Sequence, residues 1–466
     1  MKNNTFYLVS LGCAKNTVDS ESMAQLLSAS GYRLVGDPTH ANVLIVNTCG
    51  FIGPAKAESL EVLRELAAGK RKEQMLIAAG CLTQRYGAEV ARQVPGIDGI
   101  IGTRRWVDIV DLVKRLRHGK HPEPIYHLPD TPVTVMDEAG VQRFSVQGAS
   151  AYIKIADGCR RPCAFCAIPL IKGSAVSRPV EAIIPEGVAL QLAGVRELVL
   201  IAQDTTDYGH DLGLKDGLAV LLEALVEALR LSRGKQPGVN WIRIMYAYPG
   251  YVTDRLIDVM AAYPQIVPYL DMPLQHAHPA VLRRMRRPAN VDWVYRTLEK
   301  MRTAMPGLAL RTTFIVGYPG ETEGEFQALL DFIQEIRFDR VGAFQFSFEP
   351  GTTSEPLGDP VPPEVKQERW ERLMELQQSI SLERNQSWVG KTLDILVEGY
   401  GDGLSVGRTY RDAPEIDGLT IVEGELPLGE LIPVRITGAM AYDLTGTVET
   451  GQVVLAEPFI RESSFR

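Results

Sequence analysis

The sequence predicts an α/β protein with three parts: an N-terminal doubly wound parallel sheet, a central partial (β/α)6 barrel and a small C-terminal antiparallel β-barrel. A chain of 466 residues is too long for one compact core. Short apolar runs alternate with helical patterns over residues 1–120 and again over 149–383. Beyond a long charged helix at 364–387, short strands separated by glycine turns replace that alternation.

The first domain, residues 1–120, is predicted from short continuous apolar runs, which suit a parallel sheet covered on both faces. The strands are expected at 6–10, 43–46 and 75–79, and the helices at 17–29, 55–68 and 107–116. Ligands of such folds bind at the carboxyl ends of the strands. Cys13, Cys49 and Cys81 each follow one of these strands within a few residues. We therefore expect the three thiols to converge on one edge of one sheet.

Residues 121–148 are rich in proline, histidine and aspartate and are predicted to be a linker. The second domain, residues 149–383, repeats the βα pattern. Its strands are expected at 151–157, 196–203, 241–248, 269–274, 309–316 and 340–347, with helices such as 217–231, 291–304 and 323–337. Six units, fewer than the eight of a full barrel, predict an open or partial one. Functional residues should lie at strand ends, namely Gln203 and Asp204, Tyr248 and Pro249, Gln275 and His276, and 317–320.

The third domain, residues 384–460, is predicted to be a small antiparallel barrel. Its strands are expected at 393–397, 420–422, 431–436 and 447–449. Residues 384–466 contain seven Lys and Arg against thirteen Asp and Glu, a net of −6 compared with −8 for the whole chain. An acidic module repels phosphate backbones and attracts basic proteins, which predicts a basic protein partner.

Composition argues against a membrane protein and against a disulfide-stabilised one. No apolar run reaches the roughly 18 to 20 residues of a membrane span. The run from Phe6 to Cys13 is shorter than an export signal requires, so we expect a buried first strand and a cytoplasmic protein. Six cysteines in so long a chain favour metal or catalytic roles over disulfides.

Cys159, Cys163 and Cys166 lie within eight residues, directly after the first strand of the central domain. A structural zinc site would need a fourth ligand, and none is close in sequence, although a distant histidine remains open. A disulfide would use two thiols and leave one. An iron–sulfur cluster with one open iron uses all three and is the reading we favour.

This Cys-x-x-x-Cys-x-x-Cys motif, with Phe165 before its last cysteine, resembles the radical S-adenosylmethionine superfamily. The resemblance implies a 4Fe-4S cluster whose open iron binds the amino and carboxylate groups of S-adenosylmethionine. Electron transfer then cleaves this cofactor to a 5′-deoxyadenosyl radical. Residues 10–16, 47–52 and 79–82 resemble the N-terminal domain of methylthiotransferases. There Cys13, Cys49 and Cys81 would hold a second 4Fe-4S cluster, whose open iron carries the sulfur or methylthio group.

The C-terminal barrel resembles the TRAM module that ends these enzymes, and its segment 407–418 resembles the branch that modifies a ribosomal protein. That branch adds a methylthio group to an aspartate β-carbon in the twelfth protein of the small ribosomal subunit. The radical would take a hydrogen from that carbon, and a second S-adenosylmethionine would supply the methyl group. A one-electron reductant and a sulfur donor are implied as partners. The alternatives are methylthiolation of adenosine in tRNA and a non-enzymatic, metal-stabilised ribosome-binding scaffold, and segment 407–418 could also be a solvated turn.

Contacts with S-adenosylmethionine are expected from four residues, and no catalytic residue is identified. By resemblance, Arg178 could meet the cofactor carboxylate, with structural pairing as the alternative. Gln203 lies at a strand end, and Gly317 and Gly320 allow close backbone approach. The basic patch 283–287 is predicted to be either a solvated helix face or a contact near ribosomal RNA.

Overall fold

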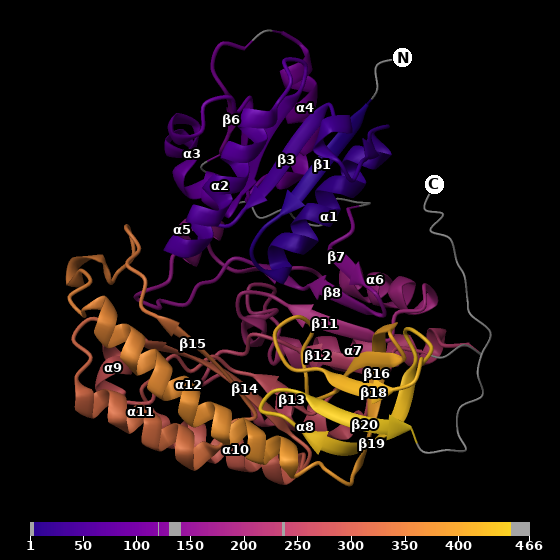
Figure 1. Cartoon of the computed structure of the whole chain (residues 1–466), viewed down its shortest axis with the longest axis vertical. Coiled ribbons are helices and arrows are strands. Elements are labelled where there is room, and N and C mark those ends of the chain that lie inside the picture. Colours follow the sequence, from indigo (N-terminus) through magenta and orange to yellow (C-terminus); the bar gives the residue numbers. More distant parts are fainter. Residues whose placement is uncertain (1–3, 120, 130–140, 235–237, 449–466) are drawn as a thin grey trace.

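The computed structural model describes residues 4–119, 121–129, 141–234 and 238–448. An N-terminal α/β domain (indigo) lies above a central barrel (magenta to orange), and a small β-barrel (yellow) packs against the central one from the other side (Figure 1). Residues 130–140 of the expected linker and the end of the expected last domain, 449–460, lie outside the described residues. Among the residues that are described, no helix is long and apolar enough to cross a membrane.

The N-terminal domain is a parallel sheet with strand order β2-β1-β3-β4-β5-β6. The strands are β1 (Thr5–Ser10), β2 (Arg33–Leu34), β3 (Val43–Thr48), β4 (Met75–Gly80), β5 (Gly99–Gly102) and β6 (Ile125–His127). The helices are α1 (Ala14–Ala29), α2 (Gly53–Gly69), α3 (Cys81–Gln93) and α4 (Ile109–Arg117). One apolar cluster joins one face of the sheet to α1 and α4, and a second joins the other face to α2 and α3. The doubly wound prediction is therefore confirmed.

The central domain has two main sheets, β12-β11-β8-β7 and β13-β14-β15, joined by a parallel bridge between Ile242 and Ile266, and a short two-stranded sheet, β10-β9. Its strands are β7 (Phe144–Gln147), β8 (Ser150–Lys154), β9 (Ala156–Asp157), β10 (Val176–Ser177), β11 (Glu197–Ile201), β12 (Trp241–Ile244), β13 (Tyr269–Asp271), β14 (Ala309–Val316) and β15 (Arg340–Gln345). Its helices are α5 (Ile168–Lys172), α6 (Val180–Leu192), α7 (Gly217–Ser232), α8 (Asp254–Ala262), α9 (Pro279–Arg284), α10 (Val291–Ala304) and α11 (Glu323–Ile336). The six predicted strands are all present, and they form an open barrel.

Helix α12 (Pro363–Gln386) runs along the outside of β15, where the Trp370 indole donates to the Ala343 carbonyl at 2.9 Å. It leads into a closed barrel with strand order β16-β17-β18-β20-β19. The strands are β16 (Thr392–Gly401), β17 (Leu404–Thr409), β18 (Thr420–Glu423), β19 (Leu431–Ala439) and β20 (Leu444–Val448). The predicted change from βα units to a small barrel is confirmed.

Segment 407–418 closes the end of the central barrel at which its strands begin. The Arg408 guanidinium donates to Glu197, the first residue of β11, at 2.6 Å. Arg411 pairs with Asp339 at 2.7 Å, and Asp417 accepts from the Tyr269 hydroxyl at 2.7 Å. Because Arg408 and Arg411 are each only 1% exposed, the alternative that this segment is a solvated turn is wrong.

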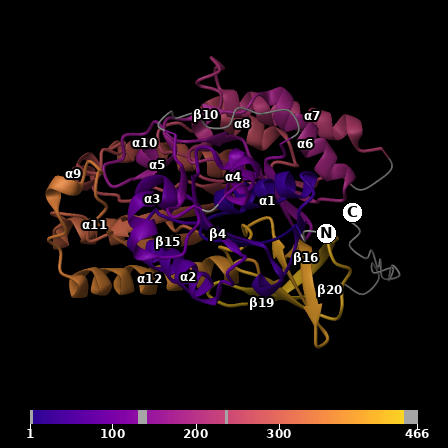
Figure 2. The ribbon, with the colours of Figure 1, turned by 90° about the horizontal axis from the view of Figure 1, so that it is seen from above.

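The N-terminal domain covers the opposite end of the central barrel, where its parallel strands finish (Figure 2). Arg85 pairs with Glu349 at 2.6 Å, and Arg104 donates to the Ile171 carbonyl at 2.8 Å. On the α1 side, the Glu21 carboxylate accepts from the Ser145 hydroxyl at 2.6 Å. These contacts hold the carboxyl ends of the N-terminal strands against the carboxyl ends of the barrel strands.

Candidate active site between the N-terminal sheet and the barrel

Cys13, Cys49 and Cys81 follow three adjacent strands, β1, β3 and β4, and their loops pack against one another. A Cβ on Gly12 would lie 2.9 Å from Cys49 Cβ and 3.0 Å from its sulfur, and Gly12 has a φ of +93°. A Cβ on Gly50 would lie 2.8 Å from the Leu82 nitrogen. Only glycine at these two positions allows the three loops to come so close. These packed loops bring Cys13, Cys49 and Cys81 to one edge of the sheet, as predicted.

The thiols of this group, here called the sheet triad (Cys13, Cys49 and Cys81), differ in burial. Cys13 is exposed, whereas Cys49 and Cys81 are partly covered. Burial raises the pKa of Cys81 to about 12, Lys172 opposes that rise, and the neighbouring Cys13 and Cys49 add to it. Protons are therefore held tightly on the Cys49 and Cys81 sulfurs until a metal displaces them.

The second group, the loop triad (Cys159, Cys163 and Cys166), lies on the loop between β9 and α5. Arg161 fixes this loop to the end of β11 through an ion pair with Asp204 at 2.6 Å. The Ala164 amide donates to the Met285 carbonyl at 2.8 Å. Burial raises the pKa of Cys159 to about 11 and that of Cys166 to about 12. The loop is thus held at the mouth of the barrel by contacts on both sides.

Arg287 and Tyr248 contact the middle thiol of the loop triad. The Arg287 guanidinium donates to Cys163 Sγ at 3.5 Å, and the Tyr248 hydroxyl lies 3.7 Å from the same sulfur. The guanidinium also lies 4.3 Å from the centre of the Tyr248 ring. Tyr248 was expected at a strand end. Arg287 belongs to the patch 283–287, and its 9% exposure rules out a solvated position for this member.

The two triads fit iron–sulfur clusters better than they fit single metal ions. All six cysteines are free, so none is used in a disulfide. Within the described part of the chain, no three Cys, His, Asp or Glu side chains converge closely enough to hold one ion. A four-iron cluster spreads its thiolates over different iron atoms, so its ligands stand further apart. Three soft thiolates per group are also the donors that such clusters require.

A buried ionic network joins the N-terminal domain to the barrel between the triads. Lys172, the last residue of α5, pairs with Asp157 at 3.0 Å and with Asp19 of α1 at 3.2 Å. Lys154 pairs with both aspartates, and Arg143 pairs with Asp157 at 2.7 Å. Burial alone lowers the pKa of Lys172, but Asp157 and Asp19 raise it well above its usual value. Sequence reasoning missed this network because its members lie far apart along the chain.

Lys15 extends from the Cys13 loop into the barrel mouth. Its ammonium lies 3.2 Å from the centre of the Tyr246 ring and 3.5 Å from the Ala202 carbonyl oxygen. Tyr246 has a φ of +63°, a strained conformation for a bulky residue. Its amide donates to Asp271 at 3.1 Å, which holds the ring beneath Lys15. Lys15 therefore lies between the sheet triad and the ends of the barrel strands.

The four residues expected to contact S-adenosylmethionine have different surroundings. Arg178 donates to the Lys154 carbonyl at 2.9 Å and pairs with Glu186 at 2.8 Å, which is the structural pairing considered as its alternative. Within the described chain, the buried Gln203 Oε1 has no hydrogen-bond partner. A Cβ on Gly317 would lie 2.4 Å from Lys366 Cγ, and the Gly320 carbonyl accepts from Arg284 at 3.1 Å. Packing against α12 and α9 therefore accounts for these two glycines without a ligand.

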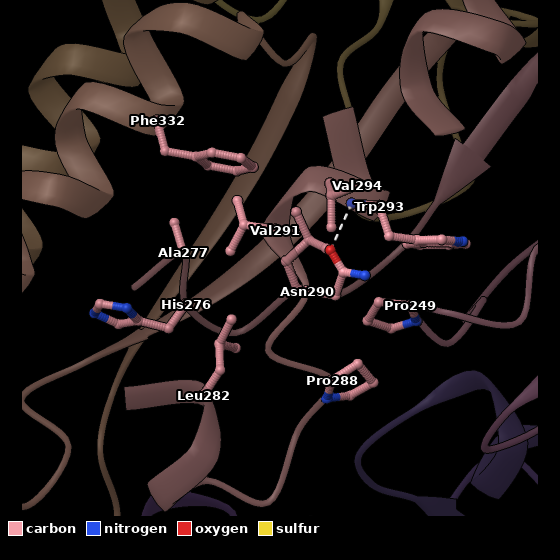
Figure 3. A pocket seen from close by; sticks show the side chains of 11 residues that line it. Pro249, His276, Ala277, Leu282, Pro288, Asn290, Val291, Trp293, Val294 and Phe332 are labelled. Carbon is pink, nitrogen blue, oxygen red and sulfur yellow. Dashed lines mark hydrogen bonds between the residues drawn. The ribbon is translucent and has the colours of Figure 1, made fainter. Parts of the chain in front are cut away.

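The cavity beside His276 is too small for a cofactor (Figure 3). It measures about 10 Å³, no more than one water needs, and is lined mainly by apolar side chains. Burial lowers the pKa of His276 to about 3, so this side chain is neutral. His278 caps α9 by accepting from the Ala280 amide at 3.3 Å. None of these contacts brings His276 or His278 to a triad sulfur.

Three known families match this chain. Residues 5–102 match the Uncharacterized protein family UPF0004, residues 153–333 the Radical SAM superfamily and residues 389–448 the TRAM domain. The chain is 52% identical over 457 residues to the ribosomal protein uS12 methylthiotransferase RimO of Chloroflexus aurantiacus, covering 95% of this chain and 99% of that protein. It is 47% identical over 462 residues to RimO of a Roseiflexus species, covering 95% and 96%.

A solved structure is similar in fold. The radical S-adenosylmethionine methyltransferase TsrM from Kitasatospora setae, with cobalamin and a 4Fe-4S cluster bound, matches with a TM-score of 0.57 at 14% identity. The match covers 87% of this chain and 77% of that chain. At this identity, the likeness shows that both chains share an architecture.

Proposed function

Because the chain belongs to the family of ribosomal protein uS12 methylthiotransferases named RimO, we propose that it adds a methylthio group to the β-carbon of an aspartate in that ribosomal protein. It is a radical S-adenosylmethionine enzyme. The named relatives favour neither methylthiolation of tRNA adenosine nor a non-enzymatic scaffold. We place the reaction in the cytoplasm, with the ribosomal substrate.

One observation carries this proposal: residues near each group of three thiols meet at the interface between the N-terminal sheet and the barrel. Lys172, six residues beyond the last cysteine of the loop triad, acts electrostatically on Cys81 of the sheet triad. Lys15, two residues beyond Cys13, touches the ends of β11 and β12. A substrate side chain in this space would be within reach of both triads, as sulfur insertion at an unactivated carbon requires.

Each triad is proposed to hold one 4Fe-4S cluster, two in all. When bound, the loop cluster supplies the electron that cleaves S-adenosylmethionine, and the sheet cluster supplies the methylthio group. The protein positions both. The Arg161–Asp204 pair and the Arg287–Tyr248 stack hold the loop triad, whereas the packed glycine loops hold the sheet triad. The protein therefore sets the distance between them through the contacts of its N-terminal domain with the barrel.

Gln203 is proposed as a contact for S-adenosylmethionine, because its Oε1 is buried at a strand end without a partner in the described chain. A buried amide oxygen without a hydrogen bond costs about 1 to 3 kcal/mol, which a ligand donor would recover. Cofactor contacts by Arg178, Gly317 and Gly320 remain predictions, and the neighbours found for these residues support a structural role at least as well.

The C-terminal barrel is proposed to attract the basic ribosomal protein, although with less charge than its composition indicates. Asp412 pairs with Arg340 at 2.6 Å and Asp417 with Arg311 at 3.3 Å, inside the molecule. The exposed acids on the described part of this barrel include Asp394, Asp402, Glu415, Glu423 and Glu425. These could steer a basic partner towards the site. An external one-electron reductant, a sulfur donor and proximity of patch 283–287 to ribosomal RNA also belong to the proposal.

The proposal is tested by removing one triad at a time and assaying the reconstituted protein anaerobically with uS12. The wild type should bind about eight irons, and each triple cysteine-to-alanine variant about four. The sheet-triad variant should still form 5′-deoxyadenosine but transfer no methylthio group, whereas the loop-triad variant should do neither. About four irons in the wild type, or zinc alone, would contradict the two-cluster proposal.

A further inference from the structure

Lys15 is a cation without a carboxylate partner at the centre of the proposed site. Its described contacts are the Tyr246 ring face and the Ala202 carbonyl oxygen, the latter at the long distance of 3.5 Å. No ion pair joins it to a carboxylate within the described chain. Because Lys15 is also the second residue of α1, the positive end of that helix further disfavours its charge.

Two other cations around this space have carboxylate partners, whereas Arg287 contacts the Cys163 sulfur, the Pro273 carbonyl and the Tyr248 ring. Lys172 is held by Asp19 and Asp157, and Arg161 by Asp204. The nearest acid that could serve Lys15, Asp271, already pairs with Arg311 at 2.9 Å and accepts from the Tyr246 amide. These acids are therefore already paired with other cations. The buried network of Lys172 itself contains three cations and two carboxylates.

A partly buried ammonium without a counter-ion is costly, and it becomes favourable when a ligand brings an anion. The strained Tyr246 backbone holds the Tyr246 ring beneath the Lys15 ammonium, and the ring blocks the ammonium from moving deeper into the barrel. Lys15 is in this way held at the mouth of the barrel, next to the loop that carries Cys13. An anion bound there would lie beside the sheet triad.

We propose that the Lys15 ammonium binds the side-chain carboxylate of the substrate aspartate and so selects aspartate over its amide. This inference rests on the proposed function. The carbon to be modified is bonded directly to that carboxylate carbon. An ion pair at Lys15 therefore holds the β-carbon between the sheet triad and the barrel mouth. A neutral asparagine offers no charge to the ammonium and is discriminated against.

The test compares two peptides with the uS12 sequence around the target, one with aspartate and one with asparagine, on reconstituted holoenzyme. Binding is measured anaerobically by fluorescence anisotropy, and 5′-deoxyadenosine formation is measured in parallel. The wild type should bind the aspartate peptide about 10- to 100-fold more tightly, the range expected of a charged hydrogen bond. Lys15→Met should abolish this preference and leave asparagine binding unchanged, whereas Lys15→Arg should retain part of it. Lys114→Met, an equal change of charge at an exposed side chain of α4, should behave as the wild type.

Two results would overturn the assignment of Lys15. One is a Lys15→Met variant that keeps the preference for aspartate. The other is an equal loss for both peptides together with a fall in iron content from about eight to about four, which would assign Lys15 to the sheet cluster. A wild type that transfers no methylthio group to the saturating aspartate peptide would instead overturn the proposed function.

Discussion

Gly12 is the position at which one added methyl group should disrupt the sheet triad and leave the loop triad intact. Its φ of +93° and the 2.9 Å approach to Cys49 leave no room for a side chain. In Gly12→Ala we expect backbone strain of about 1 to 2 kcal/mol together with displacement of Cys49. Iron analysis should then show about four irons instead of about eight. Reductive formation of 5′-deoxyadenosine should persist, because the loop triad is unaffected.

The control for this prediction is Gly31→Ala. Gly31 has a similar φ of +83°, but nothing lies within 4 Å of the position that a Cβ would take. This variant therefore carries the backbone strain without the collision and should keep about eight irons. Equal iron content in the two variants would show that the approach of Gly12 to Cys49 does not control the sheet triad.

Some single residues could be assigned a role from the sequence, and others could not. Cys13, Cys49 and Cys81 could be grouped because each follows a strand of one parallel sheet. Lys15 could not be assigned a role, because Ala202 and Tyr246 reach it only through the docking of one domain on another. Arg287 stood in a patch expected to be solvated or near RNA, and its contact with Cys163 spans 124 positions.

At the scale of elements, segment 407–418 connects the C-terminal barrel to the central one through buried ion pairs. Arg408 lies between Glu197, Glu398 and the Ser150 hydroxyl. Burial raises the pKa of Glu197, but the opposite effect of Arg408 and Arg243 is larger and lowers that pKa to about 2. The carboxylate therefore stays charged and depends on both guanidinium groups.

Removing one of those partners should loosen the C-terminal barrel. Arg408→Met leaves Glu197 with Arg243 as its one cationic partner beside the Ser150 hydroxyl, and breaking a buried pair costs about 3 to 5 kcal/mol. We expect a lower urea midpoint and earlier proteolytic release of the C-terminal barrel. Arg435→Met removes an exposed arginine from β19 of the same barrel and should change neither measurement. Equal midpoints for wild type and Arg408→Met would show that this pair does not hold the barrel in place.

Helices and strands in which apolar residues recur at regular spacing could be predicted from the sequence, whereas short or irregular ones could not. All six barrel strands were expected, although 241–248 and 269–274 run past the observed ends at Ile244 and Asp271, and the long helix α12 was expected within one residue of its bounds. The two-residue β2 and the three-residue β6, which lies within the expected linker, are too short to show a period. Helix α3 begins at Cys81 itself, after Gly80 with a φ of +103°, and no capping side chain marks that start.

At the scale of the whole molecule, the barrel is closed at both ends by different domains. The N-terminal domain covers the carboxyl ends of its strands, and segment 407–418 covers the amino ends (Figure 1). On the proposed function, the chemistry takes place at the interface between the N-terminal domain and the barrel, where Lys15 lies. At this scale the charge count overstated the exposed negative charge of the C-terminal barrel, because acids such as Asp412 pair internally with an arginine 72 positions away.

The central claim is that the two triads act together on an aspartate of uS12. The most direct measurement is mass spectrometry of uS12 from cells that lack this gene and from cells that carry it again. The account predicts one methylthio group on the aspartate, present only when the gene is present, and unchanged methylthiolation of tRNA. An unmodified uS12 in both strains, or the loss of only the tRNA modification, would contradict it.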